Sequence, residues 1–113
     1  MNKLSGERKV KQLLTNKKLA MLKQYLGRDH SIDCLFILYL NCGKWGEAKS
    51  FAKQVGFSLS FSAYRSRMRE LENLGIATSR QIDPIKKQYV LTDYGKKLTK
   101  ALLTVFDAVA SRT

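Results

Sequence analysis

The chain has 113 residues, the length of one domain, and its 44% apolar content is typical of a globular protein rather than a disordered tail. Lys and Arg total 21 against 9 Asp and Glu, so the formal net charge is +12. This excess of positive charge predicts a polyanionic partner, nucleic acid before an anionic membrane surface, and no apolar run is long enough to span a bilayer.

Residues 7–26 predict one amphipathic helix. The stretch contains no Gly or Pro, and its apolar residues recur at helical spacings: Val10, Leu14, Leu19, Leu22 and Leu26. Lysines fill positions between them, and residues 1–28 carry eight basic side chains against one acid, Glu7. We therefore expect a basic N-terminal helix that ends near Gly27.

Three more helices are expected in the middle of the chain, over residues 32–41, 47–55 and 61–74. The first is apolar on all sides and should be the central buried helix. The other two are amphipathic, with inward faces formed by Ala48, Phe51, Ala52 and Val55 and by Tyr64, Met68 and Leu71. A glycine follows each helix and is expected to end it.

A β-hairpin is expected after these helices. Residues 76–82 and 88–91 have the β-branched, alternating character of strands, and the turn 83–86 begins with Asp-Pro, which favours a type I turn. Thr92 then caps a last helix over residues 93–111. The elements together predict a mainly α protein with a small β-hairpin.

Three features of residues 32–98 resemble the winged helix-turn-helix family. A small-residue helix that includes residues 47–52 is followed by a turn and a basic helix. Residues 69–76, Arg-Glu-Leu-Glu-Asn-Leu-Gly-Ile, are similar to the L-E-x-x-G-[LI] stretch that closes the recognition helix of many small regulators. Residues 89–98, Tyr-Val-Leu-Thr-Asp-Tyr-Gly-Lys-Lys-Leu, are similar to the Y-x-L-T-x-x-G-x-x-L stretch that follows the wing. The resemblance is to MarR-like and PadR-like small transcriptional regulators.

The resemblance implies a winged helix-turn-helix core over residues 31–92. A basic N-terminal helix (1–28) and a C-terminal dimerisation helix (93–113) would be added to this core within a single domain. The chain departs from the usual pattern in residues 56–60, where it is slightly longer, so the start of the recognition helix is fixed less firmly than its end.

The helix 61–74 is expected to lie in the major groove, which admits one α-helix. Its front carries polar and cationic groups, of which Arg65, nearer the N-terminus, is expected at a base edge and Arg67 and Arg69 at phosphates. The hairpin residues are expected to reach the DNA backbone or minor groove. The candidate DNA-binding residues are Ser60, Ser62, Arg65, Ser66, Arg67, Arg69, Arg80, Lys86 and Lys87.

The last helix is the candidate for self-association, because its apolar residues recur at a coiled-coil-like spacing and would be exposed on a lone domain. We expect a two-fold homodimer whose recognition helices lie about one DNA turn apart and read a palindromic site. The expected interface residues come from both terminal helices: Leu14, Leu22, Leu98, Leu102, Val105, Phe106 and Val109.

Enzyme activity is not expected. No nucleophile, phosphate-loop or metalloprotease motif is present, and Glu70 and Glu72, two residues apart, do not share a helix face. A single histidine and the absence of a C-x-x-C pair predict no metal site, and Cys34 and Cys42 lie too far apart on a helix for a disulfide. No cofactor is expected, and a small-molecule effector is left open.

The N-terminal residues lack the apolar segment of a signal peptide, which predicts a cytoplasmic, nucleoid-associated protein.

Two other functions stay open. An architectural, chromatin-type or plasmid-partition protein would coat DNA with weak sequence preference, as the high charge and the basic N-terminal helix favour. A winged-helix interaction module would instead present its basic face to an acidic protein. Membrane binding by the N-terminal helix is disfavoured, because the helix has no Trp or Phe anchor.

Overall fold

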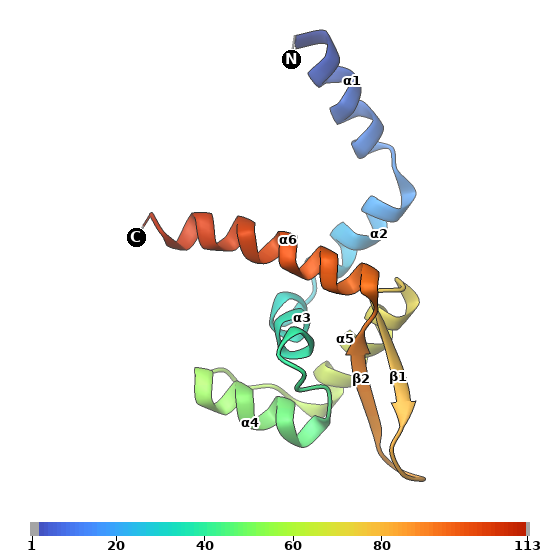
Figure 1. Cartoon of the computed structure of the whole chain (residues 1–113), viewed down its shortest axis with the longest axis vertical. Coiled ribbons are helices and arrows are strands. Elements are labelled where there is room, and N and C mark those ends of the chain that lie inside the picture. Colours follow the sequence, from blue (N-terminus) through green and yellow to red (C-terminus); the bar gives the residue numbers. More distant parts are fainter. Residues whose placement is uncertain (1–2, 113) are drawn as a thin grey trace.

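The computed structural model describes residues 3–112, which form six helices and one two-stranded antiparallel sheet (Figure 1). In chain order the elements are α1 (Lys3–Leu14), α2 (Lys17–Leu26), α3 (Ser31–Tyr39), α4 (Trp45–Val55), α5 (Phe61–Asn73), β1 (Ala77–Gln81), β2 (Lys87–Leu91) and α6 (Asp93–Ala110). This order confirms the mainly helical fold with a small hairpin. Within the described residues, no helix has both the length and the apolar character needed to cross a membrane.

The N-terminal segment forms two helices, which corrects the prediction of a single one. α1 ends at Leu14 and α2 begins at Lys17, because the backbone of Asn16 is extended and its side-chain oxygen accepts a hydrogen bond from the Leu19 amide at 2.9 Å. Such a side-chain cap starts a new helix. α2 packs on the domain through Tyr25, whereas α1 points away from it (Figure 1) and leaves its apolar side chains exposed: Val10, Leu13 and Leu14.

The core lies around α3, as its apolar sequence predicts. Four residues of α3 are at most 2% exposed: Cys34, Leu35, Ile37 and Leu38. Both cysteines are free, and burial raises the pKa of Cys34 to about 12, which keeps its thiol protonated at neutral pH. α4 contributes the buried Ala48 and Ala52, but Val55 is exposed rather than inward, because it lies in the last turn of α4, outside the core.

The loop after α3 joins the hairpin through Gly43. Its carbonyl accepts hydrogen bonds from the Tyr89 amide of β2 at 3.0 Å and from the Tyr64 hydroxyl of α5 at 2.7 Å. A Cβ atom at position 43 would lie 1.7 Å from the Tyr89 carbonyl oxygen. Only glycine therefore allows the loop, α5 and the hairpin to meet here.

α6 begins at the cap that the sequence predicts. The Thr92 side-chain oxygen accepts a hydrogen bond from the Gly95 amide at 3.0 Å. Gly95 lies against the backbone of Ile76, where an added Cβ would be 2.0 Å from the carbonyl oxygen. The first half of α6 is thereby held against the start of the hairpin, and its C-terminal end extends beyond the core (Figure 1).

Candidate nucleic-acid interface

The exposed face of α5 carries four of the predicted DNA-binding residues: Ser62, Arg65, Ser66 and Arg69. The opposite side of the helix packs on the core through three buried residues: Tyr64, Met68 and Leu71. Ser60 precedes the helix, and its hydroxyl accepts a hydrogen bond from the Ala63 amide at 3.1 Å. Ser60 is therefore the cap that starts α5, and its contact with DNA stays a prediction.

Arg65 and Arg69 lie beside the hairpin. Burial raises the pKa of Tyr89 on β2, and Glu72 raises it further, whereas Arg69 and Arg65 act to lower it. The two guanidinium groups are thus close enough to β2 to influence its side chain electrostatically.

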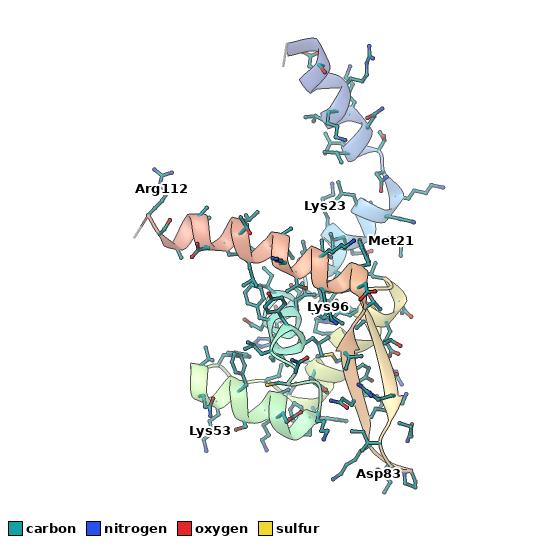
Figure 2. The ribbon with its side chains drawn as sticks, viewed as in Figure 1. Met21, Lys23, Lys53, Asp83, Lys96 and Arg112 are labelled. Atoms are coloured by element: carbon teal, nitrogen blue, oxygen red, sulfur yellow. The ribbon has the colours of Figure 1, made fainter. Side chains whose placement is uncertain are left out.

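The hairpin tip carries two further cations, Lys86 and Lys87, which are exposed. Asp83, at the end of the hairpin (Figure 2), orders the turn. Its carboxylate accepts hydrogen bonds from the amides of Ile85 and Lys86 at 2.8 and 2.7 Å, and these two bonds lower the pKa of Asp83. The two lysines are therefore presented by a turn with a defined shape.

Arg67 lies on the inner side of α5, which corrects its predicted role as a phosphate contact. Only 13% of its side chain is exposed. Its guanidinium donates hydrogen bonds to the Glu70 carboxylate at 2.6 Å and to the Asp29 backbone carbonyl at 3.1 Å. Arg67 thus joins α5 to the loop between α2 and α3. The sequence contained a signal for this position, because Arg67 lies four residues before the inward-facing Leu71 and shares its side of the helix.

Replacing Arg67 with alanine is expected to lower the free energy of unfolding by about 1–3 kcal/mol, because Glu70 loses its charged hydrogen-bond partner. Urea denaturation followed by circular dichroism measures the change. Arg65→Ala, on the exposed face of the same helix, is the matched control and should alter stability by less than about 0.5 kcal/mol. Equal stability of the two variants would contradict the structural role of Arg67.

Arg80 lies on the face of the hairpin opposite α5. Its neighbour Ser79 points toward α5 and donates a hydrogen bond to the Glu72 carboxylate at 2.8 Å, and successive strand residues point to opposite faces. Arg80 instead lines a groove of about 540 Å³ together with three residues of α6: Lys96, Lys97 and Lys100. None of these four cations forms an ion pair within residues 3–112. We call these four residues the second basic surface. Arg80 therefore belongs to a different surface from the cations of α5 and the hairpin tip.

The predicted dimer residues divide between the core and the surface. Leu22, Leu98 and Leu102 are partly buried against the core of their own chain. Phe106 packs edge-on against Phe36, with ring centroids 5.9 Å apart. The remaining members are exposed: Leu14, Val105 and Val109. The surface open to a second chain is therefore α1 and the outer half of α6, by which we mean the exposed side of α6 around Val105 and Val109. This surface includes fewer residues than the sequence predicts.

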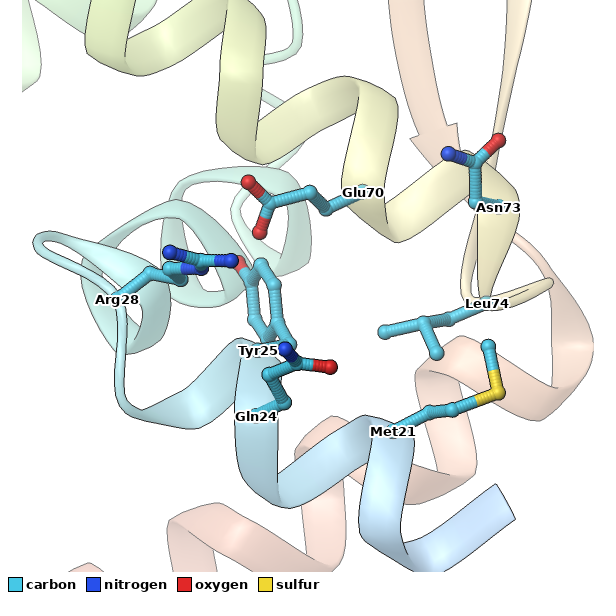
Figure 3. A pocket seen from close by; sticks show the side chains of 7 residues that line it. All are labelled: Met21, Gln24, Tyr25, Arg28, Glu70, Asn73 and Leu74. Atoms are coloured by element: carbon cyan, nitrogen blue, oxygen red, sulfur yellow. The ribbon is translucent and has the colours of Figure 1, made fainter. Parts of the chain in front are cut away.

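A cavity of about 200 Å³ separates α2 from the end of α5 (Figure 3). Tyr25, Arg28 and Glu70 line one end of it, and Met21 and Leu74 lie at the other. No sequence pattern predicts this cavity, because it forms where two helices distant in the chain diverge. It lies behind α5, on the side of α2, and takes no part in the exposed face described above.

The helix pair α4 and α5, followed by the hairpin and flanked by α2, α3 and α6, defines a winged helix-turn-helix fold and confirms the predicted fold class. Solved structures show the same fold. MepR of S. aureus in complex with DNA is similar with a TM-score of 0.61 and 19% identity, covering 99% of this chain and 81% of that chain. A transcriptional regulator homologue from Pyrococcus horikoshii OT3 has a TM-score of 0.57 and 16% identity, covering 92% and 95%. No protein-family model and no curated protein sequence matches the chain.

Proposed function

We propose that the protein binds double-stranded DNA and regulates transcription, with α5 in the major groove and the hairpin tip beside it. The observation that carries the proposal is the exposed face of α5, in which Arg65 and Arg69 lie next to a basic wing. A helix with an apolar back and a cationic front fits the one-helix width of the major groove. The likeness in fold to MepR, solved in complex with DNA, supports this use of the surface.

The cations of the interface take two roles in this proposal. Arg65, nearer the start of α5, contacts a base edge, where an arginine can bind guanine through two hydrogen bonds. Arg69, one turn later, contacts a phosphate, as do Lys86 and Lys87 at the wing. Contacts to phosphate position the protein and supply affinity, whereas the base contact supplies sequence preference.

A two-fold dimer is part of the proposal. α1 and the outer half of α6 leave apolar side chains uncovered: Val10, Leu13, Leu14, Val105 and Val109. Both helices project from the core (Figure 1), so a second copy can cover them without blocking α5. A symmetric pair would present two α5 helices to half-sites about one DNA turn apart.

Replacing both Val105 and Val109 with aspartate is expected to shift the protein from dimer to monomer, because a charge buried in an apolar interface is costly. Sedimentation velocity over a concentration series measures the shift. Ser50→Asp with Gln54→Asp adds the same charge to the exposed side of α4 and should leave the dimer intact. A wild-type chain that still sediments as a monomer at about 100 μM would have a dimer dissociation constant too weak to be useful in a cell. That result would contradict the proposed dimer.

A second candidate function, coating DNA with weak sequence preference, is favoured by the second basic surface. Arg80 and the three lysines of α6 add unpaired cations away from α5. Such a surface can hold phosphate backbone without reading bases. Binding of this kind depends steeply on salt and only weakly on sequence.

Selection of bound duplexes from a random-sequence pool at about 150 mM salt separates the candidates. Enrichment of a palindrome with half-sites about one turn apart supports the dimeric regulator. Binding without enrichment that falls steeply with salt supports the coating function. A protein that retains no duplex would contradict both.

A further inference from the structure

The hairpin tip carries an apolar side chain that the fold does not use. Ile85 is 90% exposed, the highest value among the large hydrophobic side chains that the structure describes. Pro84 beside it is exposed as well, and Ile82 is 44% exposed. By contrast, Ile37 and Ile76 are at most 1% exposed. The hairpin tip therefore presents an exposed apolar side chain beside the two lysines of the wing.

The turn holds Ile85 in a fixed position. The Asp83 carboxylate accepts hydrogen bonds from the Ile85 and Lys86 amides at 2.8 and 2.7 Å. The Ile82 amide donates to the Lys86 carbonyl at 2.9 Å and closes the hairpin below the tip. Pro84 has a fixed φ angle. Because the backbone is already ordered, inserting the Ile85 side chain into a partner would lose little conformational entropy.

The surroundings of Ile85 suit DNA better than a protein. Lys86 and Lys87 follow it directly, and the one carboxylate of the turn, Asp83, is already bonded to two backbone amides. An apolar tip of this size is far smaller than the roughly 800 Å² that each partner of a stable protein interface buries. An apolar side chain followed directly by two cations instead matches the wedges that proteins insert between base steps from the minor groove.

We propose that Ile85 is such a wedge and that it partly unstacks one base step in the minor groove beside the α5 contact. The inference rests on the proposed DNA binding and adds to it a residue that senses how easily the DNA deforms. Lys86 and Lys87 contact the phosphates on either side of the opened step. Pyrimidine–purine steps unstack most easily, so the wedge favours a TA or CA step at this position of each half-site.

The test measures duplex affinity and bend angle for the full chain with Ile85→Ala, using energy transfer between labelled duplex ends to follow the bend. Ile85→Ala is expected to weaken binding about tenfold and to reduce the bend. The slope of log Kd against log salt stays unchanged, because no cation is lost. Ile85→Met keeps an apolar wedge and should bind nearly as the wild type does. Lys86→Ala is the contrasting variant, which lowers the salt slope by about 1.

The midpoint of thermal unfolding of Ile85→Ala should equal that of the wild type, because the side chain makes no core contact. A loss of affinity in this variant would then come from the DNA interface and not from unfolding. Wild-type affinity and bend in Ile85→Ala would overturn the wedge while leaving DNA binding by α5 intact. A wild-type chain that binds no duplex would overturn the proposed function and the wedge together, so the two failures are distinguishable.

Discussion

Replacing Gly43 with alanine is expected to lower the free energy of unfolding by about 3–5 kcal/mol. The added Cβ would meet the Tyr89 carbonyl oxygen at 1.7 Å, so the loop and the hairpin must separate. Overpacking of this kind costs about 1–3 kcal/mol, and the two hydrogen bonds to the Gly43 carbonyl each contribute about 1 kcal/mol more. Urea denaturation at fixed protein concentration measures the change.

Gly46→Ala is the matched control for this substitution. Gly46 lies in the first turn of α4, and an added Cβ there meets no atom within 4 Å. Alanine favours a helix over glycine by up to about 1 kcal/mol, so this variant should be neutral or slightly more stable. Equal free energies of unfolding for Gly43→Ala and Gly46→Ala would contradict the close contact at Gly43 between the loop, α5 and the hairpin.

Replacing both Arg65 and Arg69 with alanine is expected to weaken binding to the selected duplex at least 100-fold, because a base contact worth about 1–3 kcal/mol and a phosphate contact are lost together. The single variants separate the roles. Arg65→Ala relaxes the preference at one base pair, whereas Arg69→Ala weakens binding to all sequences alike and lowers the salt slope by about 1. Fluorescence anisotropy with matched and mismatched duplexes measures both effects.

Lys96→Ala with Lys100→Ala removes the same charge from the second basic surface and is the matched control. Under the regulator proposal this double variant loses less than about threefold in affinity, since its lysines lie away from α5 and long-range attraction is screened by salt. An equal loss in the two double variants would show that charge, and not the face of α5, determines binding. That outcome would favour the coating function.

The sequence predicts the elements that depend on local pattern. The apolar run of α3, the inward stripe of α5 and the cap at Thr92 each specify their structure through spacing or through one side chain. Both the Asp83 turn and the pairing of the two strands follow from residues within the hairpin itself. For the same reason, the exposed face of α5 could be predicted from its helical period.

The features that the sequence does not predict depend on competition or on distant contacts. Asn16 interrupts a continuous amphipathic pattern, because its side chain offers the backbone a cap that periodicity does not take into account. The sequence predicts Arg67 as a DNA contact, because it does not show that the Asp29 carbonyl, distant in the chain, accepts a hydrogen bond from Arg67. Arg80 belongs to the wing in sequence, but the strand alternation turns it toward α6. The apolar residues of α6 likewise divide, because Leu98 and Leu102 pack on the chain's own core whereas Val105 and Val109 are exposed.

We propose that the exposed face of α5 and the hairpin tip form the surface that contacts DNA. Amide chemical-shift changes in two-dimensional ¹H–¹⁵N spectra, recorded while the selected duplex is added, test it most directly. The largest changes are expected on residues 60–69 and 82–87, with small changes on the exposed side of α4 and at Lys96 and Lys100. Changes concentrated on the second basic surface or on α1, with α5 unaffected, would contradict it.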